Sequence, residues 1–411
     1  MSFLPPHQPP FTGPRRFPVM AHSHLNIDLL LYAALLLVVS GMALLKPRSD
    51  FDEVFYSGLV YLNQGLPFET VHQRVYTAVR QDIPPDKQSY FLNENDFRTD
   101  LAGDATHFAQ MFPYYSVKPL FVLAGMMAFR ILPFLNVMSA LTLVSVVSYV
   151  LTASIVWRWI GASIGDTHLR FAVCTLIAWL PDLLAAARRA LPDMLATALI
   201  VSGIYLMAQS GRMIVGGGLL VLSVWTRPDS LVLAIMLFGL FIFRRRLEVL
   251  PGVILAGLAA GSYFVILHFA GSYGWEALFR ITFQGGMSAF QTAPVPISAR
   301  MYLSQFPTQL LRISGANLPL YVLLCIVCIA RARERTSRDL CFVMLAGSAV
   351  RLLLYPNFEE RYFLAPYIIC AVLGILAALG TGRSSSSTPS HEFRTGFQPK
   401  GLAEARVTPI G

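Results

Sequence analysis

Apolar runs of membrane-spanning length recur along most of this chain, from Ile27 to Leu379. They match the roughly 17 to 25 residues that a helix needs to cross a bilayer. Hydrophobic residues make up 55% of the 411 residues and charged residues only 13%, whereas about a quarter of the residues in a soluble domain are charged. The sequence therefore predicts an all-α, polytopic transmembrane helical bundle without a separate soluble domain.

The two ends of the chain differ in composition from its apolar centre. Residues 1–26 are rich in proline and are predicted to form a disordered cytoplasmic leader, within which Met20 is an alternative start. Residues 381–411 are rich in serine and basic, and are predicted to be a disordered cytoplasmic tail. A single transmembrane domain, residues 27–380, lies between them. Residues 46–118 or more form its long first extracytoplasmic loop, which is expected to contain interfacial helices.

Basic clusters fix the predicted orientation, because short cytoplasmic loops carry an excess of Lys and Arg. Such clusters precede the first apolar run and recur at residues 244–246 and 331–338. Between the first loop and the second cluster the frame requires an odd number of crossings, yet there are six apolar runs. The shortest run, Pro119 to Leu132, is interpreted as an interfacial or re-entrant helix. About ten spans then remain, with both termini cytoplasmic; if this run does cross, another run is the half-element.

Three acidic residues, Asp50, Asp52 and Glu53, follow the first apolar run. Acids at such short spacing raise one another's pKa unless cations or a metal ion offset their charge. A carboxylate of this kind can take a proton from a hydroxyl group during glycosyl or acyl transfer. The alternative is an ordinary polar cap at the end of a span. Tyr56 belongs to the aromatic-rich pattern that follows, which favours a helix lying along the membrane interface.

Three cations are candidates for binding a phosphate at the outer surface. Lys118 lies among aromatic residues in FPYYSVKPLF, where an ammonium group can hold a lipid phosphate or simply snorkel beside an aromatic belt. Arg351 lies near the end of one apolar run, and Arg361 stands just before the last one. Either arginine can bind a phosphate or balance the neighbouring acids Glu359 and Glu360.

Charged residues also interrupt the apolar stretch WLPDLLAAARRALPDM. Charges at membrane depth are expensive and usually face a wet cavity or a partner. Asp193 follows a proline at the start of a span and is the favoured site residue, whereas Asp182 is expected to pair with an arginine. Arg227 opens a later span in a similar way, and a turn in which Asp229 caps the next helix is an equally good interpretation.

The sequence lacks the motifs of several other classes of protein. Its net charge of +9 is spread over short loops and is not interleaved with stacking aromatics, which argues against a nucleic-acid partner. No HExxH, phosphate-binding GxxxxGK or GxSxG motif is present. Cys325 and Cys328 have redox or metal spacing, but within an apolar run they are interpreted as core residues. We predict no cofactor, with a divalent metal ion among the acids left open.

Five short segments, taken in order, resemble motifs of the integral-membrane glycosyltransferases of the C superfamily. The resemblance is to the protein O-mannosyltransferase and lipid A aminoarabinose transferase branch. The segments are FDEVFYSGLVYLNQG, YYSVKPLF, FRILPFLNVMSALT, ALPDML and ERYFLAP. The resemblance implies that Asp52 is the catalytic base, with Glu53 beside it and Asp193 as a second acid. It also implies that Lys118 and Arg361 contact a lipid phosphate.

Together these observations give one function hypothesis and two alternatives. A sugar is expected to move, with inversion, from a polyprenyl-phosphate donor to a hydroxyl of a glycan, lipid or protein on the extracytoplasmic face. The resemblance implies a bacterial inner membrane as the setting, and no metal. A transporter or flippase for a lipid-linked or small polar substrate is the alternative, and a non-catalytic membrane assembly partner is the third. The predicted site comprises catalytic Asp52, Glu53 and Asp193, phosphate-binding Lys118, Arg361 and Arg351, and supporting Asp50, Tyr56, Arg130 and Arg227.

Overall fold

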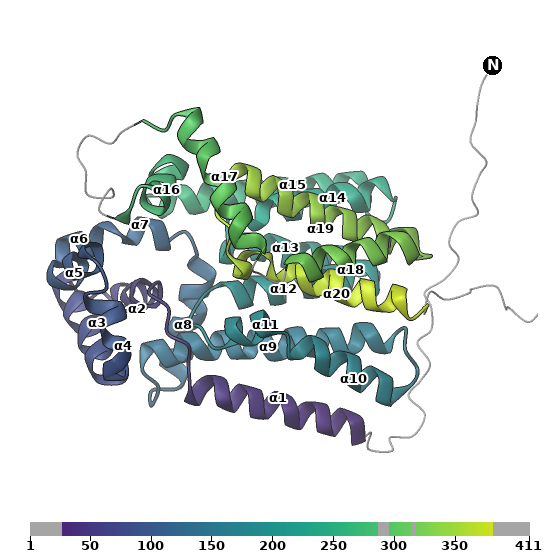
Figure 1. The fold of residues 1–411 in the computed structure, drawn as a ribbon, viewed down its shortest axis with the longest axis horizontal. Coiled ribbons are helices and arrows are strands. Elements are labelled where there is room, and N and C mark those ends of the chain that lie inside the picture. The colour runs from purple at the N-terminus through teal and green to yellow at the C-terminus, as the bar shows by residue number, and fades with distance from the viewer. Residues whose placement is uncertain (1–26, 287–295, 315–317, 381–411) are drawn as a thin grey trace, which may run out of the picture.

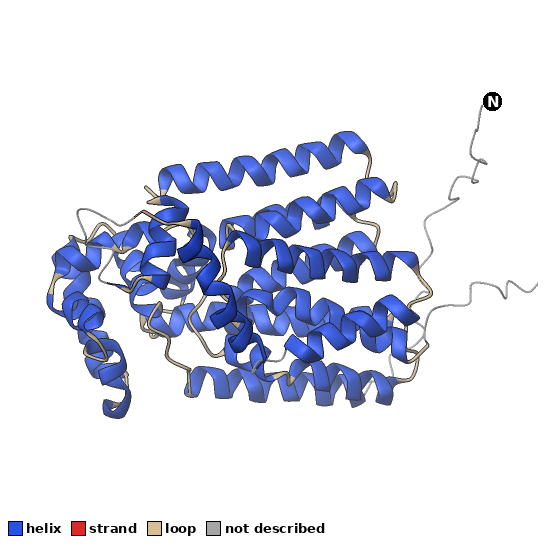
Figure 2. Ribbon diagram, turned by 45° about the horizontal axis from the view of Figure 1, so that its top comes forward, coloured by secondary structure: helices blue, strands red, loops and turns tan. Residues whose placement is uncertain are grey.

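The computed structural model describes residues 27–286, 296–314 and 318–380, and every regular element in these ranges is a helix. The predicted all-α class is therefore confirmed. Long apolar helices with roughly parallel axes form a bundle, and shorter helices cap one end of it (Figures 1 and 2). The predictions made for the leader, residues 1–26, and for the tail, residues 381–411, lie outside the described residues.

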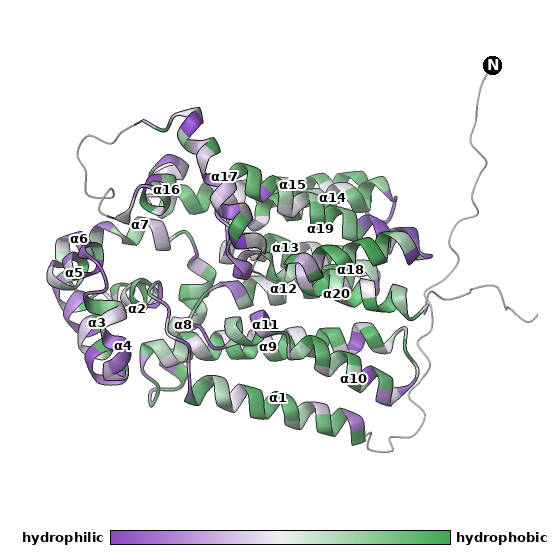
Figure 3. Cartoon of the chain, viewed as in Figure 1, coloured by the Kyte–Doolittle hydropathy of each residue, from purple (hydrophilic) through white to green (hydrophobic). Residues whose placement is uncertain are grey.

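Several helices of the bundle are apolar enough to lie in a membrane, as their hydrophobic surfaces show (Figure 3). Four in the described ranges are also long enough to cross one: α1 (Ile27–Leu45), α9 (Val137–Gly161), α15 (Val249–Phe269) and the segment Glu360–Ala378, which joins η2 (Glu360–Phe363) to α20 (Leu364–Ala378). The shorter helices are α8 (Pro119–Ile131), α12 (Asp193–Ala208), α13 (Met213–Thr226), α14 (Ser230–Phe243) and α18 (Leu318–Arg331), and the more polar α19 (Arg335–Leu354) completes the bundle. The count of about ten spans stays a prediction, as does the non-crossing of α8.

The apolar run from Leu169 to Ala187, expected to be one straight span, is a broken pair of helices. α10 (Thr167–Ala178) and α11 (Pro181–Ala187) meet at an angle of 63°. The break follows from the proline that opens α11, because proline lacks an N–H and disfavours a helical conformation in the residue before it. Leu180 accordingly has a ψ of 128°. Counted as one bent span, the pair raises the number of candidate spans in the described ranges to five.

The long first loop folds into six short helices that form most of the cap. α2 is buried over residues 53–60, whereas its aromatic pattern suggested a helix lying on the membrane interface. The reason is that α3 and α7 pack on it as well as α8 and α9, so little of its surface is left for lipid or water. The six helices are α2 (Glu53–Leu62), α3 (Phe68–Asp82), α4 (Pro85–Leu92), α5 (Asp96–Gly103), α6 (Ala105–Gln110) and α7 (Phe112–Tyr115).

Two further helices, α16 (Gly274–Phe283) and α17 (Ala299–Ser314), complete the cap. Trp275 of α16 donates a hydrogen bond of 2.8 Å from its indole nitrogen to a backbone carbonyl at the end of α19. Gln309 of α17 accepts a hydrogen bond of 2.9 Å from the backbone N–H of Phe358. These bonds fix both helices to the segment that connects α19 with η2.

A close contact between two glycines holds α12 against α13. A Cβ atom added to Gly203 would lie 2.8 Å from the carbonyl oxygen of Gly216, and one added to Gly216 would lie 2.6 Å from that of Gly203. Small residues allow helix backbones to approach this closely in membrane proteins. The contact therefore positions α12, which begins at Asp193.

Gly203→Ala is expected to lower the melting temperature of the purified protein in detergent. The new methyl group must displace a backbone carbonyl, and overpacking of this kind destabilises by about 1–3 kcal/mol. Gly218→Ala on α13 is the matched control, because a Cβ at that position meets nothing within 4 Å and alanine favours a helix over glycine. Equal melting temperatures for the two variants would contradict the close contact.

Candidate functional site

The linker between α1 and α2 brings Asp52 to the cap end of the bundle, against Arg361 of η2. Asp52 Oδ2 lies 3.2 Å from Arg361 Nη2 across 309 residues of sequence, and Asp52 Oδ1 accepts a hydrogen bond of 2.9 Å from the Tyr115 hydroxyl. Asp52 occupies the N-cap position of α2 without forming a capping bond. Burial alone would raise the pKa of Asp52, but the charges of Arg361 and Lys118 outweigh it and lower that pKa.

Asp50 lies beside Asp52 but is bound less closely. Its Oδ1 accepts a hydrogen bond of 3.2 Å from the backbone N–H of Asp52. Its Oδ2 lies 3.6 Å from Arg361 Nη1 and 3.9 Å from Arg189 Nε, which are ion-pair distances rather than hydrogen bonds. Burial, and then the charge of Asp52, raise the pKa of Asp50. The pKa values of the two neighbouring carboxyl groups are therefore shifted in opposite directions.

Glu53 is the third acid of the motif and is only 4% exposed. Its Oε1 accepts a hydrogen bond of 3.2 Å from the backbone N–H of Ala190. Burial raises the pKa of Glu53 to about 8, so the side chain is mostly neutral at pH 7. Glu53 thus links α2 to the turn that precedes α12, and its predicted catalytic role stays a prediction.

Lys118 stands at the start of α8 between two aromatic rings. Its Nζ donates a hydrogen bond of 2.5 Å to the Tyr56 hydroxyl and lies 5.1 Å and 5.3 Å from the ring centroids of Tyr56 and Tyr115. Burial lowers the pKa of Lys118 to about 8, although Asp52 nearby acts in the other direction. Within the described ranges no carboxylate lies in ion-pair contact with Lys118, so its charge is available to an anion.

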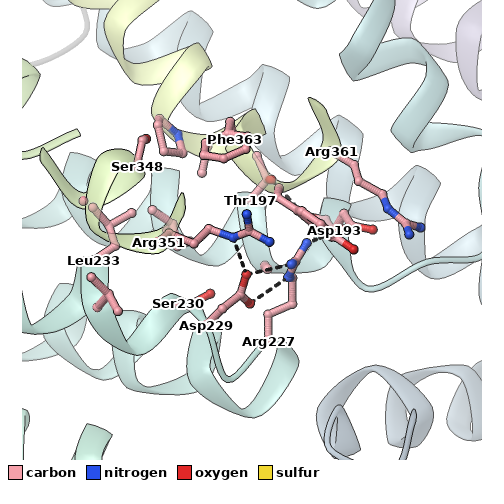
Figure 4. Close-up of a pocket in the computed structure, with 17 residues that line it drawn as sticks. Asp193, Thr197, Arg227, Asp229, Ser230, Leu233, Ser348, Arg351, Arg361 and Phe363 are labelled. Carbon is pink, nitrogen blue, oxygen red and sulfur yellow. Dashed lines mark hydrogen bonds and ion pairs between the residues drawn. The ribbon is translucent and has the colours of Figure 1, made fainter. Parts of the chain in front are cut away.

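Asp229 is the centre of a second charged cluster (Figure 4). Arg227 donates to both of its oxygens, at 3.0 Å and 2.8 Å, and Arg351 donates to Oδ2 at 3.0 Å. Arg227 also forms an ion pair with Asp193 in the first turn of α12. Burial would raise the pKa of Asp229, but the two arginines hold it well below its ordinary value. Asp229 stands at the N-cap of α14 without capping it, because its carboxylate is engaged by the arginines.

The ring of Tyr362 joins the two clusters. The guanidinium carbons of Arg351, Arg227 and Arg361 lie 4.1 Å, 4.4 Å and 5.3 Å from its centroid. An aromatic face attracts cations, and guanidinium groups stack on it well. Tyr362 therefore keeps three like charges close together without a carboxylate between each pair.

Two cavities meet at Asp193 and Arg361. The smaller one, of about 50 Å³, lies among α12, α14, α19 and α20, and Figure 4 shows the side chains that line it. The larger one, of about 600 Å³, is within the range of about 300–1,000 Å³ that is typical of small-molecule sites. Its other charged lining residues are Arg48, Asp50, Asp182, Arg189, Arg312, Glu359 and Glu360.

The structure separates one predicted site residue from the others. Arg130 is exposed in the last turn of α8, at the opposite end of that helix from Lys118, which corresponds to about 18 Å of helix. The remaining predicted residues gather around the two cavities. The sequence analysis overlooked Tyr115 and Tyr362, although each lies within three residues of a predicted phosphate-binding cation.

The fold and the site together define a helical membrane protein with buried charges at one end of its bundle. In the part of the chain that the structure describes, no group of three or more His, Cys, Asp and Glu side chains is arranged to hold a metal ion. Comparison of the chain with protein-family models, curated proteins and solved structures gives no match. The resemblance to glycosyltransferases therefore continues to rest on the short motifs.

Asp229→Asn is expected to destabilise the protein, because it leaves Arg227 and Arg351 without their shared counter-ion in a buried site. Removing one partner of a buried ion pair destabilises by about 3–5 kcal/mol. Asp82→Asn is the control: this exposed carboxylate accepts one hydrogen bond of 2.8 Å from Asn136, and a surface change of this kind stays within about 0.5 kcal/mol. Thermal unfolding in detergent measures both, and an Asp229→Asn protein as stable as the control would refute the counter-ion role.

Glu53 is expected to make stability depend on pH. Its pKa is about 8 in the folded protein against an ordinary value of 4.5, so the folded state binds this proton more tightly than the unfolded state does. Stability then falls as pH rises between these two values. Glu53→Gln is expected to flatten the dependence of the melting temperature on pH over this window. The exposed residue Glu69, changed to Gln, should leave it as in the wild type.

Proposed function

We propose that the protein transfers a sugar from a polyprenyl-phosphate donor to a hydroxyl group of an acceptor at the extracytoplasmic surface of a membrane. The observation that carries this proposal is the convergence of carboxylates and cations on one cavity. Asp52, Lys118 and Arg361 come from three distant parts of the chain, yet their side chains contact one another directly or through Tyr56 and Tyr115.

The arrangement suits a single displacement at the anomeric carbon of the sugar. The acceptor hydroxyl loses its proton to a carboxylate of the Asp50–Asp52 pair, for which the sequence motif favours Asp52. The hydroxyl oxygen forms a new bond to the anomeric carbon while the bond to the phosphate oxygen breaks, which inverts the configuration. Lys118 and Arg361 then stabilise the charge left on the phosphate. Asp193 and Arg351 border the same region and hold its arginines in place.

The surroundings of the site fit a donor with a long hydrocarbon tail. Apolar side chains are exposed along α1 and α15, which suits contact with lipid. A donor embedded in the bilayer can therefore present its phosphate at the end of the bundle while its tail stays among the lipid chains. We propose the bacterial inner membrane as the location, on the strength of the motif resemblance.

Cells that carry the double variant Asp50→Asn, Asp52→Asn are expected to lose one glycan or glycolipid product, as are cells with Asp193→Asn. Mass-spectrometric profiling of envelope sugars measures this, after immunoblotting has shown that each variant is inserted at the wild-type level. Asp82→Asn should keep the product.

Two results would contradict sugar transfer. Unchanged sugar products from a stably inserted double variant would exclude a catalytic role for these acids. An unmodified lipid-linked substrate that accumulates in one leaflet, without any loss of a transfer product in an assay with both substrates supplied, would instead indicate a transporter or flippase.

A further inference from the structure

The two aspartates of the site differ in what surrounds their oxygens. Both oxygens of Asp52 are engaged, one by the Tyr115 hydroxyl at 2.9 Å and the other by Arg361 at 3.2 Å. Asp52 lines neither of the two cavities. A substrate hydroxyl would therefore have to displace an existing partner before it could reach this carboxylate.

Asp50 has the opposite environment. It lines the cavity of about 600 Å³, and its side chain is 18% exposed. Its Oδ1 accepts one backbone hydrogen bond, but the nearest cations to Oδ2 are the arginine nitrogens at 3.6 Å and 3.9 Å. Arg189 Nε is itself buried without a hydrogen-bond partner in the described residues. Asp50 Oδ2 is thus open to a hydrogen bond from a group in the cavity.

We infer that Asp50 is the catalytic residue that takes the proton of the acceptor hydroxyl, and that Asp52 is a positioning residue that holds Arg361 toward the donor phosphate. The inference rests on the proposed sugar transfer. The acceptor enters the larger cavity and donates a hydrogen bond to Asp50 Oδ2. As its oxygen bonds to the anomeric carbon, the electron pair of the breaking bond goes to the phosphate oxygen. The proton stays on Asp50 until water in the cavity removes it.

The acidities of the two groups agree with this division of roles. A general base works best when its pKa lies near the working pH, provided that it can reach the proton. The pKa of Asp50 is raised by burial and by Asp52, whereas that of Asp52 is lowered because Arg361 and Lys118 outweigh burial. The titratable and charged groups that act on Asp50, or on which it acts, are Asp52, Glu53, Tyr90, Tyr115, Arg189 and Arg361.

Purified full-length protein in proteoliposomes provides the test. The probes are synthetic polyprenyl phosphates that each carry radiolabelled mannose, glucose, galactose or aminoarabinose, and the acceptor is a total envelope extract. Asp50→Asn is expected to lower kcat by about 10²–10⁴-fold, the usual contribution of a general base, with the donor KM unchanged. Asp52→Asn is expected to raise the donor KM and to reduce kcat less. The fall of kcat at acidic pH should persist in Asp52→Asn and disappear in Asp50→Asn, with Asp82→Asn as the wild-type-like control.

A wild-type kcat in Asp50→Asn, or loss of the acidic limb in Asp52→Asn, would overturn the inference while leaving sugar transfer intact. Absence of transfer by the wild type from every donor would instead contradict the proposed function. Coupling of glycinamide by a water-soluble carbodiimide keeps the inference testable in that case and where a variant fails to fold. This reagent modifies protonated, accessible carboxyl groups, so peptide mass spectrometry of the wild type should show faster labelling of Asp50 than of Asp52. Equal or slower labelling of Asp50 would overturn it.

Discussion

The structure depends on the neutralisation of charges that its apolar bundle buries. An isolated charge in such a setting is too costly to keep, so each buried cation needs a carboxylate or an aromatic ring close by. Asp229 serves Arg227 and Arg351, Asp52 serves Arg361, and Tyr362 lies against all three arginines. These contacts determine where α12, α14, α19 and η2 end, and they place the cavities between those ends.

The same constraint separates residues that look alike in sequence. Asp50, Asp52 and Glu53 form one short acidic motif, yet a backbone amide, two cations and an apolar enclosure give them three different environments. Glu53 is held neutral, Asp52 is held ionised, and Asp50 faces the larger cavity. A motif of three acids therefore provides one structural link, one anchor for an arginine and one carboxylate that is open to a ligand.

Much of the fold was predictable, because hydrophobic runs and proline positions are local signals. Residues Ile27–Leu45 and Val249–Phe269 are helices much as their apolar runs indicated, and the acidic motif was singled out from composition alone. Two features were not predictable from local signals. The burial of α2 depends on helices that pack on it from elsewhere in the chain, and the selection of Asp229 by two arginines depends on α19 lying beside α14. Arg130 matched a motif, but helix geometry carries it away from the site.

The way α1 is attached differs from the way the charged helices are joined. It packs on α9 mainly through apolar side chains and a hydrogen bond of 3.2 Å from Tyr32 to the Ala153 carbonyl, and only 28% of its apolar window is buried. Apolar surfaces separate without penalty when lipid replaces the lost contact, whereas parting α14 from α19 would strip Arg351 of its counter-ion. The seam beside α1 is therefore where the wall of the bundle yields most readily to an oily guest.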